Sequence, residues 1–252
     1  PDDSLDAWSY VSQLVQADGV GLALEAHRRS WPRTGGTLYW QLNDTWPVVS
    51  WSSRDHAGRW KALQYRAGEI FAPVAVLADR WADTVAVWVA ADAPVEGTLH
   101  VRLRGLGGEG LAEVSVPVAG AGPVWRTTVD TFLPAGRDPG TVFVEARLET
   151  PRSHAEARDV AFLVPPGKLA LTDPGLRVVA AEAEGDQWRV ALTAERFAYA
   201  VRISLEGADA RFSRNYVHVT PGDTVLLRIS PSTPVPDLPA RIRLRSLVDV
   251  PR

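Results

Sequence analysis

The 252-residue chain contains no cysteine, no methionine and no long uninterrupted apolar run. Without cysteine it has no disulfides, no thiolate metal sites and no cysteine nucleophile. No apolar run approaches the roughly 18–20 residues that a membrane-spanning helix needs, so no membrane partner is expected. A net charge of −3 without a basic stripe argues against a nucleic-acid partner. We expect a soluble protein, and both a bacterial cytoplasmic and a secreted location stay open.

The chain also lacks a methionine at its first position, where it reads Pro1, Asp2 and Asp3. This beginning resembles neither a translation start nor a signal peptide. The simplest expectation is therefore a piece of a longer protein. The length predicts one large domain or two to three small ones.

The composition changes near Pro73. Six of the ten tryptophans precede it, at positions 8, 31, 40, 46, 51 and 60. Beyond it the chain consists of short valine-rich alternating runs separated by glycine, proline and aspartate. We therefore expect the first 72 residues to be organised differently from the remainder.

The first 72 residues alternate between helical and strand-like patterns. A helix is predicted from about Ser4 to Arg29, with an apolar face made of Leu5, Trp8, Val11, Leu14 and Val15. Residues 37–41 form a short apolar and aromatic run that predicts a buried strand. A long polar loop follows from Asn43 to Gly58.

A second helix is predicted from Arg59 to Phe71. Its apolar face consists of Trp60, Leu63, Ala67 and Ile70. We expect Trp60 to lie in the core. The order helix, strand, long loop, helix is typical of an α/β barrel.

The remainder of the chain predicts two β-sandwiches. About seven strand-like runs lie in residues 73–165, and about seven more lie in residues 166–252, after the break at Pro165, Pro166 and Gly167. In the first set Leu99, Val101 and Leu103 alternate with polar residues, as in a half-buried strand. The predicted domains are therefore 1–72, 73–165 and 166–252.

The polar loop concentrates the side chains that suit a carbohydrate. Trp40, Trp46 and Trp51 lie in it or beside it, and a tryptophan offers a large apolar face with a polar N–H edge. Asn43, Asp44 and the pair Ser52 and Ser53 could hydrogen-bond sugar hydroxyls. Packing of these tryptophans in a core is the alternative, except that Trp40 ends the predicted strand, where α/β barrels place their active sites.

Three groups of residues resemble the C-terminal part of the family 2 β-mannosidases. The first matches the end of that family's barrel: Thr37, Leu38, Tyr39, Trp40, Gln41, Leu42, Asn43, Asp44, Trp46, Pro47, Val48, Ser50, Trp51, Ser52, Ser53, Asp55, Gly58, Trp60, Lys61, Ala62 and Leu63. The second resembles its seventh barrel helix: Tyr10, Ser12, Gln13, Gln16, Ala17, Arg28 and Arg29. The third resembles its C-terminal Ig-like domain: Phe212, Ser213, Arg214, Asn215, Tyr216, Pro221 and Gly222.

The resemblance implies a multidomain chain: the C-terminal fragment of a (β/α)8 TIM barrel followed by two all-β immunoglobulin-like sandwiches. It implies a retaining exo-hydrolase that removes terminal β-linked mannose, with a mannoside or oligosaccharide as substrate. Trp40 matches the tryptophan at the end of barrel strand eight, and the Trp40–Gln41 peptide bond is expected to be cis. The expected substrate-binding residues are Trp40, Asn43, Asp44 and Trp46.

The resemblance also implies that this chain holds no catalytic residue. Retaining hydrolysis needs two carboxylates about 5–5.5 Å apart, and in this family both are glutamates on earlier barrel strands. Glu25 and Glu69 are expected to be surface or helix charges. Asp44 is expected to fix the loop or to contact the substrate. The remainder of the barrel, in the N-terminal part of the same protein, would be the partner of this chain.

Other chemistries find little support. The histidines at 27, 56, 100, 154 and 218 lack metal-ligand spacing, so no metal is expected. No nucleophile elbow, P-loop or dinucleotide fingerprint occurs, so no cofactor is expected. The glycine-rich residues 105–110 predict a hairpin turn rather than a phosphate cradle. Arg241, Arg243 and Arg245 predict a solvated strand face, with an interdomain contact as the alternative.

Two other functions stay open. One is a sister specificity of the same family, such as β-galactosidase or β-glucuronidase. The other is a non-catalytic Ig-like module for carbohydrate binding or adhesion.

Overall fold

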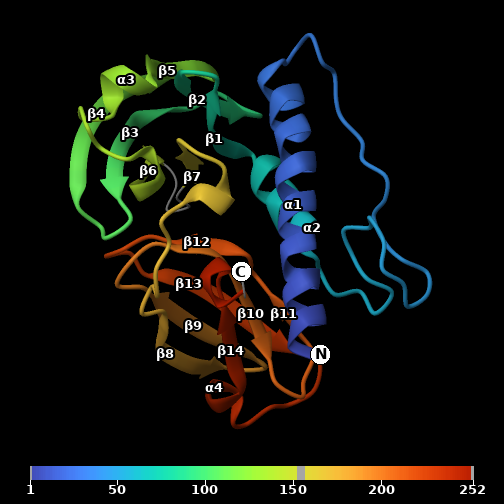
Figure 1. The fold of residues 1–252 in the computed structure, drawn as a ribbon. Coiled ribbons are helices and arrows are strands. Elements are labelled where there is room, and N and C mark those ends of the chain that lie inside the picture. The colour runs from blue at the N-terminus through green and yellow to red at the C-terminus, as the bar shows by residue number, and fades with distance from the viewer. Residues whose placement is uncertain (1, 152–156, 251–252) are drawn as a thin grey trace. The chain divides into compact units, whose positions relative to one another are not determined.

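A computed structural model describes residues 2–151 and 157–250. The chain divides into two compact units. The C-terminal unit contains residues 1–22, 38–67 and 172–252, and the middle unit contains residues 23–37 and 68–171. Figure 1 shows the elements of both units in chain order. None of the helices in the described residues has the length and apolarity needed to cross a membrane.

The first helix, α1 (Asp2–Arg29), agrees with the predicted helix but buries a different face. Its buried residues recur every three or four positions, at Ala7, Tyr10, Leu14, Ala17, Gly21 and Leu24. Of the predicted face Leu14 is buried and Val11 is half-buried, but Leu5, Trp8 and Val15 are 65%, 56% and 67% exposed. The sequence carries two apolar stripes at helical spacing, and periodicity alone does not tell which stripe is buried.

The second helix, α2 (Ala62–Ile70), begins three residues later than predicted. Leu63, Ala67 and Ile70 are buried, as expected, but Trp60 is 43% exposed. The prediction that Trp60 is a core residue is wrong because Trp60 precedes the helix and does not share its buried face. The Trp60 ring instead lies edge-on to Tyr65, with 5.2 Å between ring centroids.

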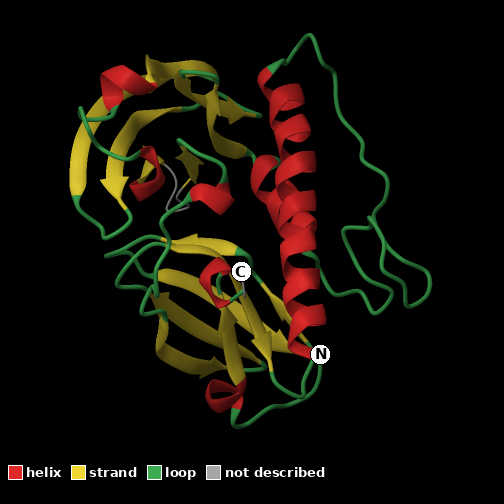
Figure 2. Ribbon diagram, viewed as in Figure 1, coloured by secondary structure: helices red, strands yellow, loops and turns green. Residues whose placement is uncertain are grey.

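The predicted strand at residues 37–41 does not form. Residues 30–61 contain neither a helix nor a strand, and Figure 2 shows this segment as loop. Leu38 is 99% exposed, so this part of the run is not buried either. A strand exists only where a neighbour completes its backbone hydrogen bonds. No strand among the described residues pairs with this run.

The middle unit contains a β-sandwich of seven strands within the described residues, as the sequence predicted. They are β1 (Val74–Trp81), β2 (Thr84–Ala91), β3 (Glu96–Gly105), β4 (Gly110–Ala119), β5 (Gly122–Thr128), β6 (Val142–Glu149) and β7 (Ala157–Phe162). The sheets have the orders β1-β2-β5 and β4-β3-β6-β7, and all pairs are antiparallel. The core lies between them and includes Val85, Val87, Leu99, Val101 and Leu103.

Local patterns in this sandwich behave as expected. The alternation of Leu99, Val101 and Leu103 is that of a half-buried strand, since all three are fully buried. The glycine-rich residues 105–110 connect β3 and β4 as a hairpin, and Gly108 has a φ of 101°. The unit also contains α3 (Val129–Phe132) and 3-10 turns at Pro139–Thr141 and Pro166–Lys168.

The C-terminal unit contains a second sandwich, again with seven strands in the described residues. They are β8 (Arg177–Glu184), β9 (Gln187–Thr193), β10 (Ala198–Leu205), β11 (Ala210–Phe212), β12 (Val217–Val219), β13 (Val225–Pro231) and β14 (Ile242–Arg245). The sheets have the orders β12-β10-β14 and β11-β13-β9-β8. Short helices occur at α4 (Leu238–Arg241) and Leu247–Asp249. Its core includes Val190, Leu192, Val201, Ile203 and Ile229.

Helix α1 is tied to this second sandwich by ion pairs. Asp6 accepts two hydrogen bonds of 2.9 Å from Arg202 on β10 and also pairs with Arg245 on β14. The hydrogen bond from Arg202 is the main cause that lowers the pKa of Asp6, with both arginine charges adding to it. Arg245 therefore contacts α1 within the C-terminal unit instead of lying on a purely solvated strand face.

Candidate functional site

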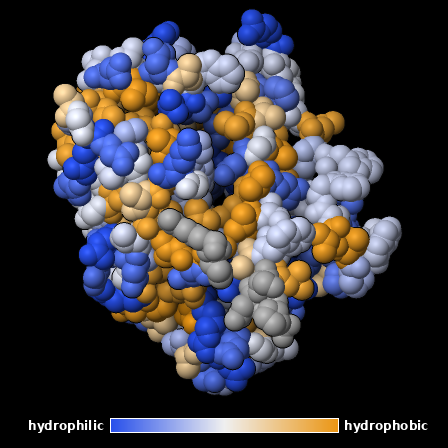
Figure 3. All heavy atoms as spheres, viewed as in Figure 1, coloured by the Kyte–Doolittle hydropathy of each residue, from blue (hydrophilic) through white to orange (hydrophobic). Residues whose placement is uncertain are grey.

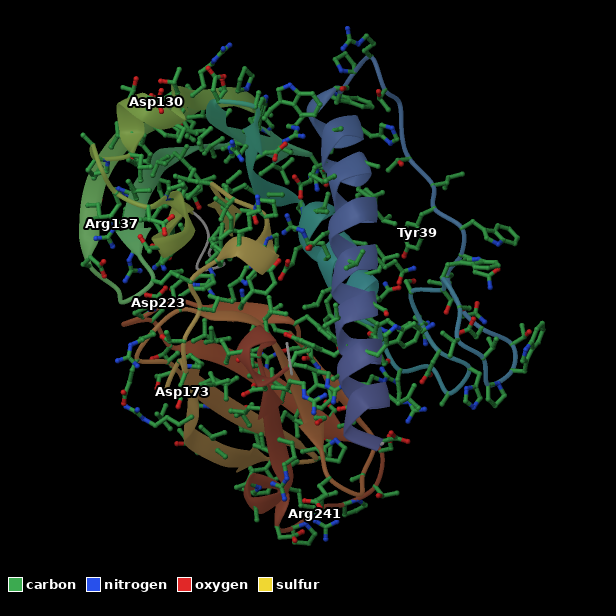
Figure 4. The ribbon with its side chains drawn as sticks, in the orientation of Figure 1. Tyr39, Asp130, Arg137, Asp173, Asp223 and Arg241 are labelled. Carbon is green, nitrogen blue, oxygen red and sulfur yellow. The ribbon has the colours of Figure 1, made fainter. Side chains whose placement is uncertain are left out.

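The site residues proposed from the sequence lie on one exposed segment, residues 38–61, which we call the tryptophan loop. Trp40, Trp46 and Trp51 are 79%, 64% and 61% exposed. In Figure 3 hydrophobic residues reach the surface at the margin where Figure 1 draws this loop. In Figure 4 its side chains, including the labelled Tyr39, spread from the ribbon. These tryptophans are therefore not packed in the core of either unit.

Backbone hydrogen bonds fold the loop back on itself. The Ser53 and Arg54 amides donate to the carbonyls of Gln41 and Leu42 at 3.0 and 2.8 Å, and the Asp44 amide donates to Arg54 at 3.1 Å. Residues 41–44 and 53–54 therefore run side by side, and the segment between them carries Trp46 and Trp51. The exposed tryptophans sit on a backbone with a defined conformation.

Asp44 forms the polar centre of this fold-back. Its side chain is only 1% exposed and accepts hydrogen bonds from Ser50, from the Ser52 hydroxyl at 2.7 Å and from the Lys61 ammonium at 3.0 Å. Lys61 also donates to the Ser52 hydroxyl at 2.8 Å. Both carboxylate oxygens are thus engaged inside the loop.

These contacts fix the charge state of Asp44. Burial on its own would raise the pKa of Asp44, but hydrogen bonds from Ser50 and Ser52 and the Lys61 ammonium hold that pKa below its ordinary value. The carboxylate is therefore ionised near neutrality. Of the two roles expected for Asp44, this geometry supports loop fixing. The sequence reasoning missed Lys61 as its partner, although Lys61 belongs to the quoted motif and is one of only two lysines.

A tight turn shapes the far end of the loop. Asp55 accepts hydrogen bonds from the Ala57 and Arg59 amides, both at 2.9 Å, and from the Arg59 guanidinium at 2.6 Å. Gly58 has a φ of 82°, which suits glycine because it has no Cβ. Arg59 also pairs with Asp209 on the second sandwich at 3.3 Å. The spacing of Asp55 and Gly58 in the motif thus follows from turn geometry.

The start of the loop is anchored through Ser53. The Tyr39 hydroxyl donates to the Ser53 hydroxyl at 3.0 Å, and Ser53 bonds the Leu42 carbonyl at 3.0 Å and the Gln64 side chain on α2 at 2.8 Å. The Trp40–Gln41 peptide bond is cis, which confirms the prediction made for this position. Asn43 is exposed beside Asp44, so three of the four expected binding residues, Trp40, Asn43 and Trp46, are accessible.

The other titratable residues considered from the sequence lie elsewhere. Glu25 is a charge on helix α1, one of the two expected settings, but it is only 4% exposed and lies 3.9 Å from Arg29. Glu69 is exposed on α2. His154 falls outside the described residues, and the described part of the chain holds no group of three metal-ligating side chains.

The motif from Phe212 to Tyr216 contacts both β10 of the second sandwich and helix α1. Asn215 is buried and imitates a strand neighbour: its carbonyl oxygen accepts from the Ile203 amide and its amide donates to the Ile203 carbonyl, both at 2.8 Å. Tyr216 follows with a φ of 52° and stacks on Tyr10 of α1 at 6.3 Å between ring centroids. The motif is therefore a docking element for α1.

Comparisons with known proteins agree with this architecture. Residues 171–250 match the family model Ig_mannosidase, described as an Ig-fold domain. β-Mannosidase A of Aspergillus clavatus is 30% identical over 201 residues, covering 71% of this chain and 22% of the relative. β-Mannosidase B of Aspergillus oryzae is 28% identical over 240 residues, covering 87% of this chain and 28% of the relative. The chain thus spans between about a fifth and about a third of these relatives.

Solved structures share the fold over nearly the whole chain. The β-D-mannosidase of Dictyoglomus thermophilum matches with a TM-score of 0.78 at 20% identity, covering 94% of this chain and 29% of that one. The exo-chitosanase of Amycolatopsis orientalis matches with a TM-score of 0.66 at 20% identity, covering 93% of this chain and 33% of that one. By sequence and by fold, this chain is β-mannosidase-like and corresponds to the C-terminal part of a protein of glycoside hydrolase family 2.

Proposed function

We propose that this chain is part of a retaining exo-β-mannosidase that hydrolyses terminal β-D-mannose residues. Similarity to curated β-mannosidases along most of the chain supports this activity for the whole protein. The observation that carries the proposal is the tryptophan loop, in which Trp40 is 79% exposed on a backbone fixed by the ion pair between the buried Asp44 and the half-buried Lys61. A rigid exposed aromatic face is suited to stacking on the apolar face of a sugar ring.

We assign residues 1–72 to the last helices and strand eight of a TIM barrel, residues 73–165 to an Ig-like sandwich and residues 166–252 to a C-terminal Ig-like sandwich. Two features support the barrel assignment. The exposed stripe of α1 includes Leu5, Trp8, Val15 and Leu22, and no strand in the described part of the chain pairs with residues 37–41. An exposed apolar stripe along a helix is typical of a surface that a partner covers. That partner would be the remainder of the same barrel.

In this proposal Trp40, Asn43 and Trp46 line one wall of the sugar pocket, and Asp44 orders the loop that forms this wall. Trp40 stacks on the terminal sugar, and Asn43 hydrogen-bonds a hydroxyl. The Asp44 carboxylate accepts hydrogen bonds from Ser50, Ser52 and Lys61. Asp44 therefore affects substrate binding by ordering the loop and does not contact the sugar itself. Trp46 extends the apolar wall.

The acid/base and nucleophile glutamates would come from outside this chain. Retaining chemistry requires two carboxylates about 5–5.5 Å apart at the sugar. Near Trp40 the chain offers Asp44, which is enclosed, and Asp55, which caps its own turn. Neither geometry suits attack on a sugar. The 252-residue chain made alone should therefore show no turnover on any glycoside, and it should associate through the exposed face of α1.

A substrate panel tests this function. The full-length protein is assayed on aryl β-mannoside, β-galactoside, β-glucuronide and β-glucosaminide, with the 252-residue chain assayed in parallel. We expect the highest kcat/KM on the β-mannoside and no turnover by the chain alone. A preference for another glycoside would contradict the proposed β-mannoside specificity and assign that other glycoside as substrate. Turnover by the 252-residue chain alone would refute the placement of the catalytic carboxylates outside it. Binding of glycans without any hydrolysis would favour an adhesion module.

A further inference from the structure

The backbone of Tyr216 is held in a conformation that bulky residues rarely adopt. Its φ is 52°, in the left-handed region. Asn215 enforces this conformation, because its side-chain oxygen accepts from the Tyr216 amide at 2.9 Å while the same side chain pairs with Ile203 on β10. Such outliers persist where their surroundings determine them, and they are frequent at functional sites.

The result is that the Tyr216 ring points from the sandwich toward the two helices. It lies 6.3 Å from the Tyr10 ring on α1 and 6.0 Å from the Tyr65 ring on α2, between centroids. Its hydroxyl donates to the side-chain oxygen of Gln13 on α1 at 3.0 Å. Burial raises the pKa of Tyr216 to about 12, so the hydroxyl keeps its proton near neutrality and stays a donor.

Gln13 passes this contact to the tryptophan loop. The oxygen that accepts from Tyr216 also accepts from the Ala62 amide at 3.2 Å. Ala62 is the first residue of α2 and follows Lys61 directly. The position of Lys61 is therefore fixed at the peptide bond next to it.

Lys61 in turn holds the loop from two sides. Its amide donates to the Ser53 carbonyl at 2.9 Å, and its ammonium donates to Asp44 at 3.0 Å and to Ser52 at 2.8 Å. A continuous series of contacts thus runs from Tyr216 through Gln13, Ala62 and Lys61 to Asp44.

We propose that Tyr216 is a positioning residue for the tryptophan loop. Through its hydroxyl and Gln13, the C-terminal sandwich sets the position of Lys61 and so the order of the loop that carries Trp40 and Trp46. The structural part of this inference stands on the contacts above, and its consequence for sugar binding rests on the proposed function.

Amide hydrogen exchange on peptides spanning residues 41–54 and 60–64 tests the structural part. Tyr216→Phe removes the hydroxyl and keeps the ring, and Gln13→Met removes the shared acceptor at similar size. Tyr199→Phe is the matched control, because the Tyr199 hydroxyl donates to Asp18 on the same helix at 3.3 Å, whereas the Tyr216 hydroxyl donates to Gln13.

We expect Y216F and Q13M to speed exchange in both peptides roughly threefold to tenfold, the effect of losing one hydrogen bond, while Y199F leaves them unchanged. The double variant should exchange no faster than Q13M alone, because both changes interrupt one series of contacts. Unchanged exchange in Y216F, an equal rise in Y199F, additive effects in the double variant, or a uniform rise throughout the C-terminal unit would each overturn the proposal.

A kinetic measurement on the full-length protein tests the consequence for the sugar. Y216F should raise KM for an aryl β-mannoside about threefold and change kcat less than twofold, since the tryptophan wall binds sugar and performs no chemistry. An unchanged KM would contradict the consequence for sugar binding. If the wild type hydrolyses no glycoside, the proposed function fails, and the exchange measurement still decides whether Tyr216 orders the loop.

Discussion

Asp44 and Lys61 are the two residues on which the order of the tryptophan loop depends most directly. Their side chains are 1% and 14% exposed, and their contact of 3.0 Å is shared with Ser52. In such a setting the loss of one partner leaves the other buried without its counter-charge, which costs more than the net value of the pair.

We predict that D44N and K61M each lower the free energy of unfolding by about 1–3 kcal/mol. Urea unfolding followed by tryptophan fluorescence measures this, with the exposed Asp186→Asn as control. The double variant should lose less than the sum of the two single losses. Full additivity would show that the two side chains do not depend on each other.

The lowered pKa of Asp44 predicts how this contribution changes with pH. A carboxyl with a lower pKa in the folded state stabilises fully above its unfolded pKa of about 3.9, and that stabilisation is lost as the pH falls through the folded pKa. The difference in unfolding free energy between wild type and D44N should therefore be constant from about pH 5 to 8 and shrink below about pH 4. A difference that grows toward acid would contradict the assignment.

Asn215 satisfies three backbone groups at once, those of Ile203 and the amide of Tyr216. Because the residue is 6% exposed, water does not readily replace these bonds. Asn215→Ala should lower the free energy of unfolding by roughly 1–3 kcal/mol, measured by thermal denaturation. The exposed Asn43→Ala serves as control and should stay within about 0.5 kcal/mol of wild type.

At the scale of elements, α1 carries an apolar stripe that is buried and another that is exposed. Leu14 and Val15 are neighbours in sequence but 7% and 67% exposed. In this chain Leu14→Ala should cost roughly 2–5 kcal/mol, whereas Val15→Ala should cost less than about 0.5 kcal/mol. Thermal unfolding measures both.

The same pair of variants tests the barrel assignment. In the full-length protein the proposed barrel covers the outer stripe of α1, so Val15→Ala should cost about 1 kcal/mol there. If Val15→Ala lowers the free energy of unfolding by the same small amount in the 252-residue chain and in the full-length protein, nothing covers this stripe.

The elements show how far the sequence predicts this fold. The strands that the structure describes in both sandwiches were predictable because alternation is a local pattern, as at Leu99, Val101 and Leu103. The strand at residues 37–41 was not, because pairing depends on a distant neighbour. Trp60 was misplaced because the helix begins at Ala62.

The same limit applies to the candidate site. The exposed Trp40, Trp46 and Asn43 were named from sequence, and so was the cis bond after Trp40. The role of Gln13 could not be predicted, because it contacts Ala62 and Tyr216, which lie 49 and 203 residues away along the chain. Such contacts exist only once the helices are docked on the sandwich.

At the scale of the whole molecule, this chain aligns with 22% and 28% of the lengths of the two β-mannosidases compared above. In the proposed function, this chain supplies a tryptophan wall and two sandwiches, and the catalytic glutamates come from the part of the protein outside it. A substitution of Trp40 tests the proposed role of the tryptophan wall most directly.

The most direct measurement is kcat/KM of the full-length protein on an aryl β-mannoside, compared between wild type and Trp40→Ala. Trp81→Ala is the control, since Trp81 is 81% exposed at the hairpin between β1 and β2 of the middle unit. The account predicts a loss of about tenfold to a hundredfold for W40A, because about 1.5–3 kcal/mol of apolar contact with the sugar disappears, and no change for W81A. Unchanged activity in W40A, or an equal loss in W81A, would contradict it.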